Sequence, residues 1–260
     1  PVYKIKVKPS KIEKEIIETY WFQRLKYIHH AGVDFTFSYK THTRYHHSLG
    51  VYSLATVFYP TNELIKISAL LHDIGHLPFS HAVENAYKTT GNKSIHHEFT
   101  KNILFKTEIS DILRGHGVSP RLVYDIIEGH VNSPIKPRNN ILGMDLFDCF
   151  VRDMYYSGMR FLPSTIIKRI KITDNGICTD VNTGKKIHRL IIEDHKLMYG
   201  KESIIRSALA QRLFSIVLDM LGDEKDEMFK YSEYEIMNEI NKLSKKNKMI
   251  RKILYVLLYS

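Results

Sequence analysis

The stretch "ALLHDIGHLPFSHAVE", residues 69–84, decides how the rest of the chain is interpreted. Its apolar residues recur at helical spacing, which predicts a buried helix. The same stretch carries three histidines, an aspartate and a glutamate, and a protein core disfavours polar side chains that lack partners. Gly75 and Pro78 should end the first helix just after His76. A second helix should begin at His81, so that the polar side chains meet at a corner between two helices.

The polar side chains of this stretch have the chemistry of metal ligands. His72 and Asp73 are adjacent, about 100° apart on a helix, so they converge only on a point off the helix edge, such as a bound cation. Imidazole and carboxylate together suit iron, manganese or zinc, and magnesium less well. In the alternative interpretation, His72 is a core histidine that bonds Asp73 or a carbonyl, His81 is a surface residue, and Glu84 complements a helix dipole.

Composition limits the class of protein. The chain has 260 residues, of which 43% are hydrophobic, enough for one large domain or a domain with an appendage. The net charge of +10 favours anionic partners such as nucleotides. Cys149 and Cys178 are far apart, which argues against a disulfide framework or a thiolate zinc site. No run reaches the roughly eighteen apolar residues of a membrane helix, so we expect a soluble cytoplasmic protein without membrane contact.

The pattern along the chain predicts a mainly α fold. Apolar residues at spacings of three and four indicate helices over most of the sequence, including 141–160, 202–221 and 231–258. "YKIKVK" (3–8) alternates and predicts a short strand. Asp-Asn-Gly, between two β-like runs, predicts a small β-hairpin insertion near 168–190.

Two further segments offer ligands that would complete a metal site. "TRYHHSLG" (43–50) places His47 just inside a probable helix, and "NILGMDLFDCFVRDMYYSG" (140–158) places three aspartates among apolar residues, namely Asp145, Asp148 and Asp153. Taken together and in order, "RYHHSLG", "LLHDIGHLPFSH", "HHE" and "MDLFDCFVRD" resemble the H…HD…D signature of the HD-domain metal-dependent phosphohydrolases. The similarity runs from about residue 20 to 160 and extends to the deoxynucleoside triphosphate triphosphohydrolase branch, which includes the SAM-and-HD-domain enzyme.

The resemblance implies a fold, a cofactor and a ligand set. Residues 1–165 would form the helical HD-domain catalytic core, and 166–260 would add the hairpin and C-terminal helices that pack on it as one compact unit. The cofactor would be a divalent metal, with manganese, iron, magnesium, nickel and zinc all open, and its ligands would be His47, His72, Asp73 and Asp145. Such a metal polarises a phosphoryl oxygen and lowers the pKa of a bound water.

The resemblance also implies catalytic side chains beside the metal. His76, His81 and His97 match the additional active-site histidines of the family. His81 would be the acid that protonates the leaving 5′-oxygen, with Glu84 orienting it and keeping it charged. His97 would hold phosphate oxygens. Its neighbour His96 matches no motif position and is expected to be exposed.

Three residues match substrate contacts of the family. Arg44 matches an arginine that contacts phosphates, Asp153 an aspartate near the sugar, and His30 a glutamine that contacts the sugar. The alternatives are a loop cation for Arg44, a helix-surface pair with Arg152 for Asp153, and a core or surface histidine for His30.

The sequence departs from the family at four substrate positions. Leu146 replaces a lysine, Cys149 replaces a sugar-stacking tyrosine, and His30 and Ala31 replace the glutamine and leucine that contact the deoxyribose. Base and sugar specificity therefore stay open. The nucleotide-activation stretch of the family is absent as well, so we do not expect nucleotide-driven tetramerisation, while a simpler homo-oligomer stays compatible with the sequence.

The leading hypothesis is hydrolysis of a (deoxy)nucleoside triphosphate to nucleoside and triphosphate. The alternative enzyme is a phosphomonoesterase or phosphodiesterase acting on another nucleotide. A nucleic-acid-binding module is a second class, suggested by the charge and by the basic residues of 242–252, but it is not favoured because few aromatic residues accompany them. A metal-free scaffold is a third class, against which the complete ligand set argues.

Overall fold

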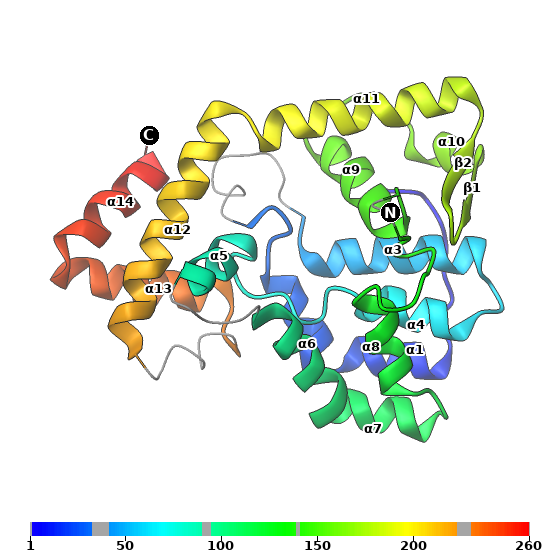
Figure 1. Cartoon of the computed structure of the whole chain (residues 1–260), viewed down its shortest axis with the longest axis horizontal. Coiled ribbons are helices and arrows are strands. Elements are labelled where there is room, and N and C mark those ends of the chain that lie inside the picture. The colour runs from blue at the N-terminus through cyan, green and yellow to red at the C-terminus, as the bar shows by residue number, and fades with distance from the viewer. Residues whose placement is uncertain (1, 33–41, 90–94, 139–140, 223–229, 260) are drawn as a thin grey trace.

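The computed structural model describes residues 2–32, 42–89, 95–138, 141–222 and 230–259, and it confirms a mainly α fold with one small hairpin. Figure 1 shows the hairpin at one end of the molecule and the last three helices at the other. The elements are α1 (Lys11–Glu18), α2 (Tyr20–Arg24), η1 (Leu25–Tyr27), α3 (Arg44–Phe58), α4 (Glu63–Leu71), α5 (His81–Thr89), α6 (Ile95–Lys106), α7 (Glu108–Gly115), α8 (Pro120–Ile127), α9 (Met144–Tyr156), α10 (Pro163–Ile167), β1 (Ile170–Thr173), β2 (Gly176–Thr179), α11 (Val181–Met198), α12 (Lys201–Leu221), α13 (Glu233–Lys246) and α14 (Lys248–Tyr259).

Helices α3, α4 and α9 form the centre of the larger apolar core, with α3 packed on both of the others. Gly50 allows α3 and α9 to approach closely. A Cβ at this position would lie 2.0 Å from Arg152 Nη2 and 2.2 Å from Asp148 Oδ1. Since no side chain intervenes, two charged groups of α9 reach the face of α3 that carries His47.

The helix break in the opening stretch comes earlier than the sequence predicted. Helix α4 ends at Leu71 rather than after His76, whereas α5 does begin at His81. A buried arginine from a distant segment explains the difference, because Arg24 Nη2 donates to Ile74 O at 3.2 Å and to His76 O at 2.7 Å. These carbonyls therefore have partners outside a helix, and residues 72–80 form a series of turns.

The end of this turn segment is strained. Phe79 and Ser80 have φ angles of 59° and 42°, in a region that is costly for residues with a side chain. Contacts from two other elements hold the strained backbone in place. Phe79 N donates to Glu233 Oε1 of α13 at 3.0 Å, and Arg44 Nη2 of α3 donates to Ser80 Oγ at 3.2 Å. Backbone strain held in this way is typical of functional sites.

The hairpin is confirmed but is shorter than predicted. Strands β1 and β2 pair antiparallel around a turn in which Gly176 has a φ of 97°, and the hairpin ends at Thr179 instead of near 190. The following residues are helical because the Asp180 side chain accepts from Thr183 N and begins α11. Residues 3–8 form no strand, so that prediction was wrong; their alternation is not matched by a pairing partner.

A second apolar cluster joins α5 to α12, α13 and α14. The single helix expected over 231–258 is divided at Asn247, whose Oδ1 accepts from Met249 N at 2.9 Å and Ile250 N at 3.2 Å. No helix in the described part of the chain is long and apolar enough to cross a membrane. The division of the chain at residue 165 stays a prediction.

Candidate metal centre

The four residues predicted as metal ligands converge from three elements. His47 Nε2 lies 3.1 Å from His72 Nε2 and 3.1 Å from Asp145 Oδ1, and His72 Nε2 lies 3.6 Å from the same Asp145 oxygen. Asp73 Oδ2 lies 3.9 Å from His47 Nε2, and Asp73 Oδ1 lies 3.6 Å from His72 Nε2. Helix α3, the turn after α4 and the first turn of α9 supply them. All are buried except Asp145, whose side chain is 29% exposed and faces the cavity described below.

The hydrogen bonds of the two histidines orient both Nε2 lone pairs toward this point. His47 Nδ1 lies 2.8 Å from Asp148 Oδ2, and His72 Nδ1 lies 2.9 Å from Ala69 O. A carboxylate and a carbonyl only accept, so each Nδ1 carries a proton, and Nε2 is the nitrogen of each ring that remains to bind a cation, either a second proton or a metal ion. Two lone pairs at 3.1 Å beside a carboxylate repel one another unless a positive charge lies between them. The donor set therefore fits a divalent cation.

The electrostatics of this cluster attract positive charge. Burial alone would lower the pKa of His47, but hydrogen bonds to Asp145 and Asp148 raise it to about 10. Burial is likewise outweighed at His72, whose pKa is raised by Asp73 and Asp145. Burial opposes ionisation of Asp73 and Asp145 too. Arg44 and two histidines nevertheless hold the pKa of Asp73 below its usual range, and hydrogen bonds from His47 and His72 do the same for Asp145. Both carboxylates are thus ionised and available as ligands.

Asp148 and Arg152 support His47 from behind. Asp148 is fully buried, and Arg152 binds it with two parallel hydrogen bonds, Nε to Oδ2 at 2.8 Å and Nη2 to Oδ1 at 2.9 Å. Burial would raise the pKa of Asp148, but Arg152 and His47 hold it well below its usual value. The sequence analysis offered Asp148 only as one of three candidate ligand aspartates and considered Arg152 for a surface pair with Asp153. The one available signal was their spacing of four residues, which places both on one helix face.

A second group of polar side chains extends from the metal ligands toward the surface. His76 Nε2 lies 3.2 Å from Asp73 Oδ1, and His76 Nδ1 lies 3.4 Å from Glu84 Oε1. The other Glu84 oxygen lies 3.3 Å from Nδ1 of His81, whose side chain is 73% exposed. Burial alone would raise the pKa of Glu84, but His76 and His81 hold it well below its usual value. An ionised carboxylate thus connects a buried imidazole to an exposed one.

Both histidines of the "HHE" motif line the cavity over the site, although only His97 was expected there. His97 is half exposed and forms an ion pair with Glu128. His96, expected to be exposed, has its ring 4.2 Å from the ring of His76, and burial lowers its pKa to about 2. Adjacent residues on a helix differ by about 100° in direction, and only packing decides which of them faces inward. His96 is therefore a site residue that the sequence analysis missed.

A cavity of about 210 Å³ lies over these two groups. It is lined by the metal-site residues His72, Asp73 and Asp145 and by the five residues of the second group, namely His76, His81, Glu84, His96 and His97. Lys136, an exposed cation of the loop before α9 that the sequence analysis also missed, lines it as well. A larger cavity of about 300 Å³ lies between the N-terminal segment and α3. No carboxylate lines this larger cavity, whereas the smaller cavity is lined by carboxylates and histidines. Of the two, the smaller cavity is therefore the one with the chemistry of an active site.

The three predicted substrate residues, His30, Arg44 and Asp153, lie beside the metal cluster. The His30 ring lies 4.4 Å from that of His47, and His30 Nδ1 lies 3.8 Å from Asp153 Oδ1. Burial and the charge of Arg44 lower the pKa of His30. Arg44 itself is buried, with Nη1 3.0 Å from Asp73 Oδ2, so its guanidinium is engaged with a candidate ligand. Asp153 is also buried and is no surface residue.

Comparisons with known proteins agree with this geometry. The family model described as HD domain matches residues 44–176. An uncharacterised MG461 homologue of Mycoplasma pneumoniae is 35% identical over 167 residues, which cover 55% of this chain and 39% of the relative. The deoxynucleoside triphosphate triphosphohydrolase SAMHD1 homologue of Dictyostelium discoideum is 26% identical over 254 residues, covering 84% of this chain and 47% of that protein.

The fold has solved counterparts. A phosphohydrolase of Bacteroides thetaiotaomicron superposes with a TM-score of 0.71 over 99% of this chain and 75% of its own, at 19% identity, a likeness of fold alone. The chain matches 39% and 47% of the lengths of the two relatives above, so their full-length activities do not transfer directly.

Proposed function

Because the chain belongs to the HD-domain family, we propose that it is a metal-dependent phosphohydrolase of nucleotides that cleaves (deoxy)nucleoside triphosphates to nucleoside and triphosphate. One observation supports this most strongly. The Nε2 atoms of His47 and His72 face each other at 3.1 Å beside two ionised carboxylates, and His72, Asp73 and Asp145 line a cavity. Core packing alone gives no reason for such a cluster.

His47, His72, Asp73 and Asp145 would hold the metal. Two imidazoles and two carboxylates suit iron, manganese, nickel or zinc better than magnesium, which prefers oxygen ligands alone. A divalent metal bound there supplies a Lewis acid for a phosphoryl oxygen and an acidified water.

The side chains around the metal would bind the substrate and move a proton. His81 stands exposed at the edge of the cavity and would donate a proton to the leaving 5′-oxygen. Glu84 accepts at His81 Nδ1, which orients the ring. Lys136 and His97 would contact phosphate oxygens. Arg44, as a phosphate contact, would share its guanidinium between Asp73 and the substrate.

A phosphomonoesterase or phosphodiesterase is the second candidate, and one observation favours it. Leu146 follows the ligand Asp145 and is 44% exposed, so an apolar side chain occupies the position where the triphosphohydrolases have a lysine. A triphosphate carries more negative charge than a monophosphate or a diester. The loss of one cation therefore weakens binding of triphosphates most.

Product analysis separates the two candidates. The purified chain would be incubated with manganese, iron or magnesium and a panel of deoxynucleotides and ribonucleotides, and nucleoside, monophosphate, triphosphate and orthophosphate would be separated. We expect nucleoside with intact triphosphate, and no products from a His72→Ala/Asp73→Ala variant. If the metal-loaded chain leaves triphosphates intact but hydrolyses monophosphates or diesters, the second candidate replaces the first.

A further inference from the structure

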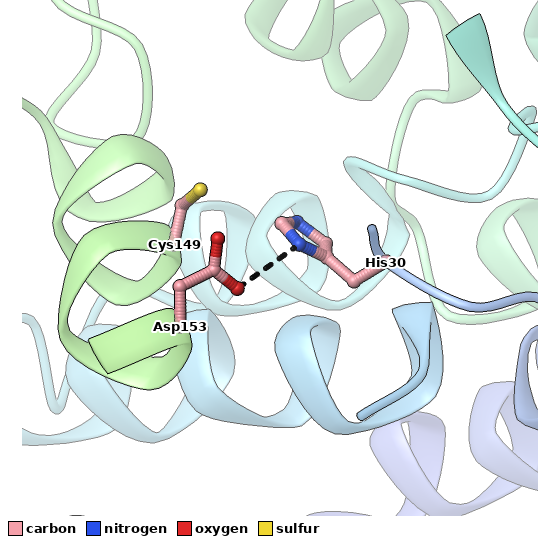
Figure 2. Close-up of side chains that lie close together, drawn as sticks. All are labelled: His30, Cys149 and Asp153. Atoms are coloured by element: carbon pink, nitrogen blue, oxygen red, sulfur yellow. Dashed lines mark ion pairs between the residues drawn. The ribbon is translucent and has the colours of Figure 1, made fainter. Parts of the chain in front are cut away.

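A second group of ligand-type side chains lies next to the metal cluster. It consists of His30, Cys149 and Asp153, and one potential ligand atom from each lies within 4.8 Å of the others. Figure 2 shows the three side chains directed toward one another from two separate segments. From this geometry we propose a second cation site, suited to a borderline-soft divalent ion such as zinc. The site goes beyond the proposed hydrolysis, which needs only the first cluster.

Helix α9 brings the two sites together. Cys149 and Asp153 are four residues apart and share one helix face, and Asp145 of the first cluster lies four residues before Cys149 on the same face. His30 approaches this face from the segment between η1 and α3, stacked between other rings. Its centroid lies 4.4 Å from that of His47 and 5.0 Å from that of His42.

The spacing and burial of the group fit a metal better than a hydrogen bond. His30 Nδ1 and Asp153 Oδ1 are 3.8 Å apart, too far for a hydrogen bond. Ligand atoms of a tetrahedral zinc site lie roughly 3.3–3.8 Å apart, because the bonds measure about 2.0–2.3 Å. The His30 side chain is 10% exposed, and in the described part of the chain no hydrogen bond reaches its ring nitrogens.

His42 lies beside the group without being one of its three members. The side chain of His42 is fully buried, and its Nε2 lies 3.3 Å from Asp153 Oδ1. Imidazole, thiolate and carboxylate are all ligand types of zinc, whereas magnesium and calcium avoid sulfur. The first cluster has no sulfur ligand, so the two sites differ in the metals they prefer.

This assignment changes the interpretation of three positions. Cys149 and His30 stand where the resembling family has a tyrosine and a glutamine that contact the sugar, and both have become metal-ligand types. Asp153 is the third residue of that region. With a cation bound, His30 and Asp153 would meet the substrate through the ion rather than directly. The sequence analysis argued against a thiolate zinc site because the two cysteines are far apart, and the proposed site departs from that expectation by combining one cysteine with ligands of other types.

Cobalt is a suitable probe, because it occupies zinc sites and develops a near-ultraviolet charge-transfer band only when a thiolate is bound to it. The metal-free chain, the Cys149→Ser variant and the Cys178→Ser variant would be titrated with Co²⁺. Cys178 is an exposed cysteine on β2, outside the group, and serves as the matched control. We expect the band in the wild type and in Cys178→Ser, its loss in Cys149→Ser, and one fewer Zn²⁺ per chain in that variant.

A variant that lacks the first cluster tests the second cation site independently of the proposed hydrolysis. The band should persist in His72→Ala/Asp73→Ala, even though this variant binds no metal at the first cluster. A wild-type chain that binds Co²⁺ without the band, or a band that survives in Cys149→Ser, overturns the second site.

Thiol labelling covers the case in which Cys149→Ser does not fold. In the folded Cys178→Ser chain, Cys149 is the remaining cysteine, and its alkylation rate would be measured with and without Zn²⁺. A metal-bound thiolate is withdrawn as a nucleophile, so we expect labelling to slow about tenfold or more with Zn²⁺ and to stay unchanged with Mg²⁺. An unchanged rate with Zn²⁺ contradicts the proposal.

Discussion

The buried ligand cluster and the exposed rim of the same cavity are built in different ways. At the cluster, each histidine nitrogen that faces away from the centre has a fixed acceptor, Asp148 or Ala69 O, within 2.9 Å. At the rim, His81 is 73% exposed and is held by one contact of 3.3 Å to Glu84. From this difference we expect packing of the cluster to determine whether a metal binds, and the exposed side chains of the rim to adjust rate and specificity. Substitutions in the two regions should therefore separate metal content from turnover.

The largest effect is expected at a ligand of the cluster. Asp145→Ala removes a carboxylate that contacts both imidazole Nε2 atoms, and we expect metal affinity to fall by more than about 100-fold, with hydrolysis lost. Metal content after dialysis and phosphate release would be measured together. Asp111→Ala, at an exposed acidic residue of α7, is the control and should change neither. Full metal content in Asp145→Ala would remove this residue from the ligand set.

A smaller effect is expected at the rim. His81→Ala removes the proposed proton donor, and we expect kcat to fall by about 10²–10⁴-fold while metal content stays unchanged. Steady-state rates and metal analysis would be compared with His188→Ala, at an exposed histidine of α11. A loss of metal from His81→Ala would show that the rim and the cluster are not separable.

A substitution at Asp148, which supports His47, should lower metal affinity but leave kcat nearly unchanged once metal is saturating. Asp148→Asn keeps the shape of the side chain but replaces the carboxylate that accepts from His47 Nδ1. We expect metal affinity to fall by about 10–100-fold, with kcat nearly restored at saturating metal, because Asp148 orients a ligand and touches no substrate. Rates would be measured across a metal titration. A lowered kcat that no metal concentration restores contradicts this positioning role.

The smallest effect concerns specificity. Leu146→Lys places a cation beside Asp145 at the exposed start of α9. We expect the KM for a nucleoside triphosphate to fall by about fivefold, with little change for a monophosphate, since one charge-assisted contact is added to the phosphate chain. Leu197→Lys, at an exposed leucine of α11, is the matched control. An equal change for both substrates points to general charge attraction.

The sequence predicted most of the cluster because its ligands belong to short motifs with local spacing. It predicted the helix beginning at His81 but not the end of α4 at Leu71. That end depends on Arg24, which reaches carbonyls about 50 residues further along the chain. It assigned His97 to the site and missed His96, because adjacent positions on a helix differ only in what packs against them.

The sequence did not predict that His30, Cys149 and Asp153 form a group, because their proximity also depends on how the chain packs. His30 and Cys149 are separated by more than a hundred residues, and only the fold brings them to one face of α9. The hairpin was predicted to be too long because the segment "VNTGKKIHRLII" contains β-like residues. In the structure this segment is helical, since Asp180 caps the start of α11. The assigned roles of the site residues stay predictions until variants are measured.

Anomalous diffraction from crystals of the manganese-loaded chain tests the central claim most directly. Data collected at the manganese absorption edge should give one strong peak within bonding distance of His47 Nε2, His72 Nε2 and the carboxylates of Asp73 and Asp145. A chain that crystallises with saturating manganese but shows no peak among these atoms, or shows the peak only elsewhere, would contradict the account.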